Sequence, residues 1–259
     1  MRGGDNAKWL LSLIAVAVAL APAAWGDDAP AAEPEKKPPV VIDFPLRHNL
    51  DKAGKVLGAG PKKAKGWVES DFWGKASVRV EGDTVIIEKG NDMTGIRWTG
   101  PLARMNYEIS LEAKRVDGSD FFCGLTFPYG KEPCSLVVGG WGGTVVGISS
   151  LDWQDAYNNE TARFMEFEKD RWYEIRLRVT PQKIEAWIDD ESIVDVETSG
   201  RHISIRFECE PSLPLGIATW RTTGAIRNVR LNAFKAQASE SNPAEESTGG
   251  THDGSADLP

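Results

Sequence analysis

Apolar and polar positions alternate with a period of two through much of residues 40–235, and no helical apolar stripe extends beyond about ten residues there. Asn106 to Ala113 shows this pattern plainly, because its odd-numbered residues are apolar while its even-numbered residues are polar or acidic. Such alternation is typical of an antiparallel strand with one buried and one solvated face. The sequence therefore predicts a domain made mostly of β-strands.

A second set of alternating segments follows later in the chain. Trp172 to Thr180 alternates in the same way, and Pro181-Gln182 then predicts a turn into a returning strand, Lys183 to Ile188. Asp189-Asp190 predicts a tight turn into Ser192 to Val196. The three segments are predicted to form a β-meander.

Further short segments of strand character bring the predicted total to about fourteen. They are Val40 to Phe44, Ser77 to Val80, Thr84 to Glu88, Gly95 to Trp98, Asp120 to Phe127, Ser135 to Val138, Thr144 to Ser149, Arg163 to Phe167, His202 to Phe207, Leu215 to Trp220 and Ala225 to Leu231. Many short strands with frequent turns indicate an all-β, two-sheet antiparallel sandwich. Leu151 to Thr161 is polar with two aromatic residues, and it is predicted to be a loop over one face of a sheet.

The N-terminal segment has the pattern of a secretory signal. Arg2 and Lys8 precede the apolar run Leu10 to Leu20, and a plausible cleavage site follows at Ala24-Trp25-Gly26. The run is shorter than the roughly 20 residues that span a bilayer, so residues 1–26 are predicted to be a signal peptide rather than a retained anchor. Cleavage would leave no membrane span, and the protein is expected in the periplasm, outside the cell or at its surface.

Amino-acid composition predicts the remaining domain boundaries and argues against one class of binding partner. Residues 27–39 mix Ala, Pro and charge and are predicted to be a linker, and residues 236–259 are predicted to be a disordered tail. Residues 40–235 are then one sandwich domain. The formal net charge of −8 argues against a nucleic-acid partner, because phosphate binding needs a basic surface. The sequence does not indicate an oligomeric state.

The three cysteines leave two interpretations open. In an exported chain a disulfide is permitted, and Cys123 with Cys134 is the better candidate pair, because a hairpin could bring them onto adjacent strands. Equally, Cys123, Cys134 and Cys209 could all be small buried apolar residues. Metal binding by these cysteines is not indicated, since no paired Cys or Cys/His spacing occurs.

Several segments resemble the 3-keto-disaccharide hydrolase family of the concanavalin A-like lectin and glucanase superfamily. The resemblance rests on the motifs Asn106-Tyr107-Glu108-Ile109, Arg171-Trp172-Tyr173-Glu174, Ile184 to Asp190, Pro214-Leu215-Gly216-Ile217 and Ile226 to Leu231. Asp190 stands where the family usually has Gly. The resemblance implies a concanavalin A-like jelly-roll sandwich that acts on a carbohydrate or glycoside, by removing the C2 proton of a 3-keto sugar and eliminating the C1 substituent.

Such chemistry requires a base and groups that stabilise an enolate. The candidate catalytic residues are Asp120, Asp152, Asp155 and Arg163, and Glu160 is a candidate for substrate binding. The strand predicted around Ser135 carries no carboxylate, which favours the alternative of a non-catalytic lectin-like or laminin-G-like module for carbohydrate binding or cell-surface interaction. Two-carboxylate glycosidase and serine-triad signatures are absent from the sequence.

Two tryptophans are candidate platforms for a sugar ring. Trp141 lies within Gly139-Gly140-Trp141-Gly142-Gly143, where it could stack on a ligand or cap the core, and Trp153 adjoins the candidate carboxylates. Calcium is a possible cofactor, because the loop holds a cluster of carboxylate and amide oxygens from Asp152, Asp155, Asn158, Asn159 and Glu160.

Overall fold

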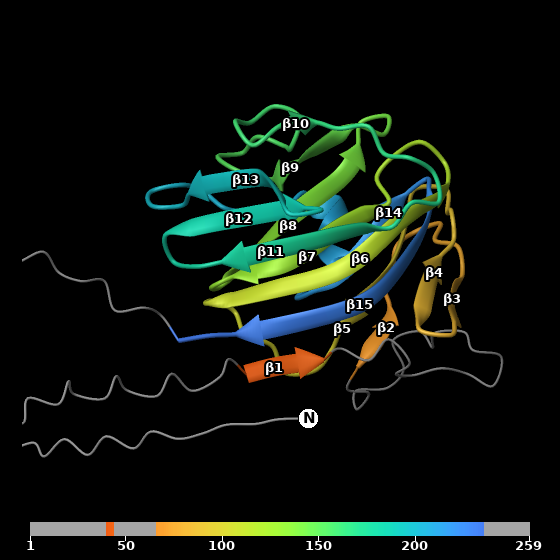
Figure 1. The fold of residues 1–259 in the computed structure, drawn as a ribbon, viewed down its shortest axis with the longest axis horizontal. Coiled ribbons are helices and arrows are strands. Elements are labelled where there is room, and N and C mark those ends of the chain that lie inside the picture. The colour runs from red at the N-terminus through yellow and green to blue at the C-terminus, as the bar shows by residue number, and fades with distance from the viewer. Residues whose placement is uncertain (1–39, 44–65, 236–259) are drawn as a thin grey trace, which may run out of the picture. The chain divides into compact units, whose positions relative to one another are not determined.

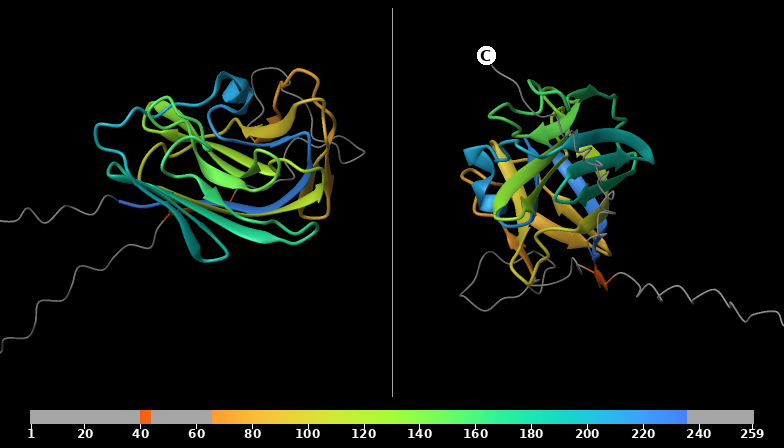
Figure 2. Two further views of the ribbon diagram at one scale, coloured as in Figure 1. Left: turned by 90° about the horizontal axis from the view of Figure 1, so that it is seen from above. Right: turned by 90° about the vertical axis from the view of Figure 1, so that its left-hand side faces the viewer.

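Two antiparallel sheets face each other across an apolar core. The computed structural model describes residues 40–43 and 66–235, all of which belong to one compact unit, 38–259. The predicted signal peptide, linker and tail, residues 1–26, 27–39 and 236–259, lie outside the described residues. Figures 1 and 2 show the two layers of the sandwich, with the eight-stranded sheet at the front in Figure 1.

The front sheet contains the meander that the alternating segments predict. Its order is β13 (Glu191–Glu197), β12 (Lys183–Ile188), β11 (Tyr173–Val179), β6 (Tyr107–Asp117), β15 (Thr223–Ala233), β4 (Thr84–Ile87) and β3 (Val78–Glu81), and β1 (Val40–Asp43) also pairs with β15. All of these pairings are antiparallel.

The second sheet has seven strands. Its order is β10 (Arg163–Phe164), β9 (Val145–Ser149), β8 (Glu132–Gly140), β7 (Cys123–Tyr129), β14 (Gly216–Trp220), β5 (Met93–Trp98) and β2 (Trp67–Glu69). One 3-10 helix, η1 (Phe207–Ser212), immediately precedes the turn into β14 among the described residues.

The core lies between the two inner faces. Tyr107, Ile109 and Leu111 of β6 alternate inward, and Leu125 and Phe127 of β7 face them from the other sheet, all at most 1% exposed. Burying a side chain of this size stabilises the fold by about 1.5–3 kcal/mol. The period-two pattern thus corresponds to burial, and the predicted two-sheet jelly-roll sandwich is confirmed.

The structure corrects several local predictions. His202 to Phe207 is not a strand, because only Ile203 makes an isolated bridge, to Leu151, before η1 begins. This segment makes its cross-strand backbone hydrogen bonds with residues 150–152, which follow β9, and Arg201 and Arg206 on either side pair with carboxylates instead. Asp120 lies in a bend before β7 rather than on a strand, and β2 was not predicted.

The hypothesis of a disulfide is also corrected. Cys123 and Cys134 do lie on neighbouring strands, but Cys123 is opposite Val138 whereas Cys134 is opposite Phe127, so the two are not cross-strand partners. All three cysteines are free. Cys123 and Cys134 are fully buried in the core, as the alternative interpretation held for all three cysteines, whereas Cys209 is only partly buried.

Candidate functional site

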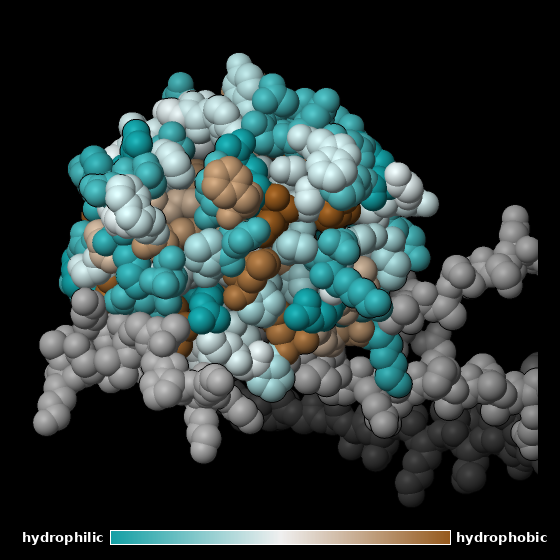
Figure 3. Space-filling view, turned by 180° about the vertical axis from the view of Figure 1, so that it is seen from behind, coloured by the Kyte–Doolittle hydropathy of each residue, from teal (hydrophilic) through white to brown (hydrophobic). Residues whose placement is uncertain are grey.

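A cavity of about 260 Å³ lies on the outward face of the seven-stranded sheet. Alternation along β7 turns Leu125 and Phe127 toward the core, which leaves Gly124 and Thr126 facing outward. The cavity is lined by Met93, Asp120, Phe121, Gly124, Thr126, Ser135, Val137, Trp141, Ser149, Arg206, Glu208, Cys209 and Trp220. Figure 3 shows this side of the molecule, where apolar surface is exposed between polar residues.

The loop that carries Trp141 is held from two sides. The Gly142 amide donates to Oδ2 of Asp120 at 3.1 Å, and Nη2 of Arg115 donates to the Gly143 carbonyl at 2.9 Å. Trp141 adopts a φ of 49°, a left-handed backbone that is uncommon for a bulky residue and often occurs at functional sites. Its side chain is 40% exposed and lines the cavity.

Arg115 is buried beneath this loop. Burial lowers the pKa of its guanidinium, and the nearby Asp120 carboxylate opposes that shift. The guanidinium also lies 5.2 Å from the Phe122 ring centroid. A buried cation and an accepting carboxylate therefore fix the position of Trp141 before any ligand arrives.

The cavity lining also contains a charged pair. Nη2 of Arg206 donates to Oε1 of Glu208 at 2.9 Å, and Nη1 reaches Oδ2 of Asp155 at 3.4 Å. Burial by itself would raise the pKa of Glu208, but hydrogen bonds from Arg206 and from the backbone outweigh it and lower the pKa. Glu208 is thus ionised at neutral pH, while the pKa of Arg206 is raised by the same contact.

Neutral polar groups complete the lining. The hydroxyls of Thr126 and Ser135 hydrogen-bond to each other at 2.9 Å. Within the described part of the chain, Oγ of Ser149 and Oε2 of Glu208 are buried without a hydrogen-bond partner. Since buried polar atoms usually find partners, these two oxygens of cavity-lining residues leave hydrogen-bonding capacity unused in this conformation.

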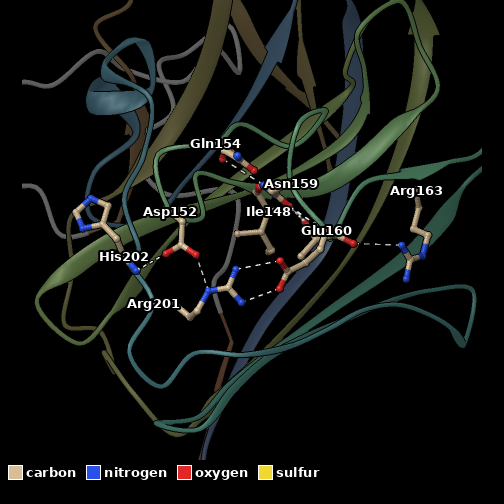
Figure 4. A network of polar contacts seen from close by, with 9 residues as sticks. Ile148, Asp152, Gln154, Asn159, Glu160, Arg163, Arg201 and His202 are labelled. Carbon is tan, nitrogen blue, oxygen red and sulfur yellow. Dashed lines mark hydrogen bonds and ion pairs between the residues drawn. The ribbon is translucent and has the colours of Figure 1, made fainter.

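Two of the other predicted site residues, Asp152 and Glu160, form a separate network with Arg201 outside the cavity (Figure 4). Arg201 donates from Nε to Oδ2 of Asp152 at 2.6 Å and from Nη1 to Oε1 of Glu160 at 2.6 Å. The His202 amide hydrogen bond, followed by that from Arg201, lowers the pKa of Asp152, and Arg201 lowers the pKa of Glu160. This network fastens the 151–161 loop to the 201–206 segment.

Trp153 and Arg163 also lie away from the cavity. The Trp153 ring stacks on His202 with centroids 3.7 Å apart and is 80% exposed. Arg163 donates to the backbone carbonyls of Glu160 and Ala162. Neither residue lines the cavity.

The 151–161 loop covers one face of the sheet, as predicted. Ala156 packs against Val137 and Val145 on the outward side of β8 and β9. The structure therefore brings Asp120 and Trp141 together in the cavity and places Asp155 against its rim through Arg206.

Arg206, Glu208 and Trp220 were missed as site residues. Arg206 fell within the predicted strand His202 to Phe207, and Trp220 ended the predicted strand Leu215 to Trp220. Trp220 lies three residues after buried Ile217 on β14 and therefore points to the opposite, outward face of the sheet. This alternation could have identified Trp220 as a site residue.

The loop residues do not fit a calcium site in this conformation. Asp152 and Glu160 give their oxygens to Arg201, while Asp155 accepts from Asn158 and Arg206. Among the residues that the structure describes, no group of three or more His, Cys, Asp or Glu side chains could hold a metal ion.

The fold is a two-sheet β-sandwich, and the family to which its sequence belongs is carbohydrate-related. The chain belongs to the family of 3-keto-alpha-glucoside-1,2-lyase-like domains, whose family model matches residues 62–232. No curated protein sequence matches this chain. The residues described contain no helix long and apolar enough to cross a membrane.

Several solved structures are similar to this chain at low identity. The carbohydrate-binding module CBM66 from Bacillus subtilis is 11% identical, with a TM-score of 0.46 over 65% of this chain and 96% of that chain. The exoplasmic/lumenal domain of VIP36, bound to Ca²⁺ and Man3GlcNAc, is 8% identical, with a TM-score of 0.46 over 74% and 92%. The apo Crh5 transglycosylase is 11% identical, with a TM-score of 0.44 over 82% and 90%.

Proposed function

We propose that the cavity binds a glycoside whose sugar carries a 3-keto group, and that the chain cleaves this glycoside by elimination. The observation that carries the proposal is that Asp120, a carboxylate, and Arg206, a cation, line the same cavity, whose walls include Trp141 and Trp220. Membership of the 3-keto-alpha-glucoside-1,2-lyase-like family supports the same substrate class. The cavity lies just below the roughly 300–1,000 Å³ of drug-sized ligand sites, which favours a small sugar.

Elimination requires a base at C2 and a donor at the C3 oxygen. The 3-keto group acidifies the C2 proton, so the Asp120 carboxylate removes that proton while the C–H electron pair forms an enolate. Arg206 then stabilises the negative oxygen. As the enolate collapses, the C1=C2 bond forms and the C1–O bond breaks, and the leaving oxygen receives the proton from Asp120.

The surrounding contacts suit these roles. Two backbone amides, those of Phe121 and Gly142, donate to the Asp120 carboxylate and fix its orientation. Glu208 stays ionised beside Arg206, so it orients the guanidinium instead of acting as an acid. The apolar faces of Trp141 and Trp220 would contact the C–H face of the sugar ring.

Binding without catalysis is the second candidate function, and one observation favours it. Both oxygens of Asp120 already accept hydrogen bonds from the backbone, as a purely structural carboxylate would. The same cavity would then act as a lectin-like recognition site or, with no sugar ligand, as part of a cell-surface interaction module.

The test is incubation of the purified chain with 3-keto-glucosides and their unoxidised parents, with the products followed by mass spectrometry. We expect turnover of the keto forms alone, loss of about 100-fold or more in Asp120→Asn as for removal of a general base, and near-normal turnover in Asp83→Asn. Asp83 is an exposed carboxylate in the turn between β3 and β4. Saturable binding without turnover would instead establish recognition. The absence of both binding and turnover would refute both candidate functions.

We further propose that the protein is exported. The charged start, the apolar run and the small residues near Gly26 support cleavage at about that point. Mass spectrometry of the protein expressed at full length would test this, because export predicts that most of the recovered chain lacks residues 1–26. Recovery of uncleaved chain in the cytoplasm would contradict it.

A further inference from the structure

Three exposed aromatic side chains form a continuous row that begins at the cavity. The ring centroids of Trp141 and Tyr157 are 6.2 Å apart, and those of Tyr157 and Phe164 are 5.9 Å apart. The three rings are 40%, 49% and 66% exposed, in that order. Trp141 lines the cavity, whereas Tyr157 and Phe164 extend the row beyond it. This set is called the aromatic row below.

Each member of the aromatic row is held by a different part of the fold. Trp141 is fixed by the contacts of its loop with Asp120 and Arg115. The amide of Tyr157 donates to Oδ1 of Asp155 at 3.1 Å, within a loop anchored on β9. Phe164 belongs to β10, where it pairs with Val145. The row is therefore ordered in advance, which limits the entropy that binding would cost.

Packing of the core does not explain this arrangement. Aromatic side chains stabilise a fold chiefly by burial, and half-exposed rings that touch one another forgo much of that gain. A contiguous exposed apolar surface more often marks an interaction site than a single exposed ring does. Continuity with the cavity indicates that the aromatic row serves the same ligand.

We propose that the aromatic row binds further sugar units of a saccharide chain whose terminal unit occupies the cavity. This inference rests on the proposed function, and it narrows the ligand to an oligosaccharide or a glycan longer than a disaccharide. The electron-rich faces of the rings suit the C–H faces of sugars. Exposed polar residues next to the row in the sequence, Asn158 and Arg163, suit the hydroxyl groups of a saccharide better than an apolar peptide.

The test is calorimetric titration of the whole chain with α-linked gluco-oligosaccharides, from disaccharide to hexasaccharide, each oxidised at C3 of its terminal unit and joined to that unit by a C-glycosidic linkage, which elimination cannot cleave. We expect the wild-type Kd to fall by about tenfold with length, on the scale of one or two aromatic contacts. Tyr157→Ala and Phe164→Ala should abolish this gain and leave the disaccharide affinity unchanged. Trp73→Ala, a control at an exposed aromatic outside the row, should keep the gain.

The outcomes separate this inference from the proposed function. Wild-type affinity that does not change with length, together with disaccharide binding, would overturn the aromatic row as a subsite and leave the cavity as the site. Absence of binding at every length would overturn the proposed function and the inference with it. A dimer that dissociates in Phe164→Ala, with length dependence intact, would identify the row as a protein contact and also overturn the inference.

Discussion

Asp120 accepts a hydrogen bond of 3.1 Å from the amide of Gly142, so the carboxylate in the cavity also supports the loop that carries Trp141. The proposed catalytic base, Asp120, and the aromatic side chain of Trp141 therefore depend on each other for their positions. Substitution of Asp120 is expected to affect both chemistry and binding. Substitution of a residue that only supports this loop should weaken binding but leave the proton acceptor, Asp120, in place.

Substitution of Arg115 tests how the loop that carries Trp141 is supported, without removing the proposed base. Arg115→Met should lower the free energy of unfolding by about 2–3 kcal/mol, because hydrogen bonds from a buried guanidinium to the Gly143 and Gly139 carbonyls are lost. Denaturant unfolding measures this loss, and glycoside affinity should fall as Trp141 moves. Lys169→Met is the control, since its pairing with Asp117 is exposed. Unchanged stability in Arg115→Met would show that Arg115 does not hold the loop.

The Arg201 network predicts a pH dependence of stability. Asp152 and Glu160 have folded-state pKa values below their unfolded values of about 4, so their contribution is present above pH ~4 and is lost as the pH falls through the lowered values. Arg201→Met should therefore melt below the wild type at pH ~7. The difference in melting temperature between the variant and the wild type should disappear toward pH ~2, where both carboxylates are protonated. It should also shrink in high salt, because these carboxylates are exposed. A gap independent of pH would disprove an electrostatic role.

Asn159 is predicted to be the main anchor of the 151–161 loop. Its side-chain amide donates to the carbonyls of Ile148 and Asp155, and its oxygen accepts from Thr161. Asn159→Ala leaves buried partners unsatisfied and should cost about 2–4 kcal/mol. Limited proteolysis should then cut within the loop, whereas Asn158→Ala, at an exposed site, should resemble the wild type. Equal protection of both variants would contradict this assignment.

The thiols are predicted to react slowly. Burial raises the pKa of Cys209 to about 11 and that of both Cys123 and Cys134 to about 12, so little thiolate forms at pH ~8. Iodoacetamide should modify Cys209 first, since Cys209 is partly exposed and lines the cavity. A bound glycoside should protect it. Mass spectrometry showing faster labelling of Cys123 or Cys134 would contradict the packing described here.

Much of the fold could be predicted because burial follows the alternation of residues. In β11, and in β6 from Tyr107 to Lys114, each inward position is apolar and each outward one polar, so two-sheet architecture follows from local pattern. The same reasoning failed at Ile203, where an alternating segment pairs with residues 150–152, beyond the end of β9, and forms an isolated bridge rather than a strand. Whether an alternating segment has a full strand to pair with is a tertiary effect that a local pattern does not record.

The site was only partly predictable for a similar reason. Asp120 and Trp141 were identified from residue type and from the glycines around Trp141. Asp152 and Glu160 belonged to the same acidic loop as Asp155, but Arg201, some 40 residues further along, engages both. The partner of a carboxylate decides whether it is free for chemistry, and a partner so distant in sequence becomes visible only in the fold.

The most direct test of the central claim is an NMR titration of the tryptophan indole N–H signals with a C-linked 3-keto-glucoside, which has no C1–O bond for elimination to break. Binding in the cavity predicts that the signals of Trp141 and Trp220 shift together and saturably, while those of Trp172 and Trp187 stay in place. These last two pack beneath arginine side chains of the eight-stranded sheet. Shifts confined to Trp172 and Trp187, or an absence of shifts at saturating glycoside, would contradict the account.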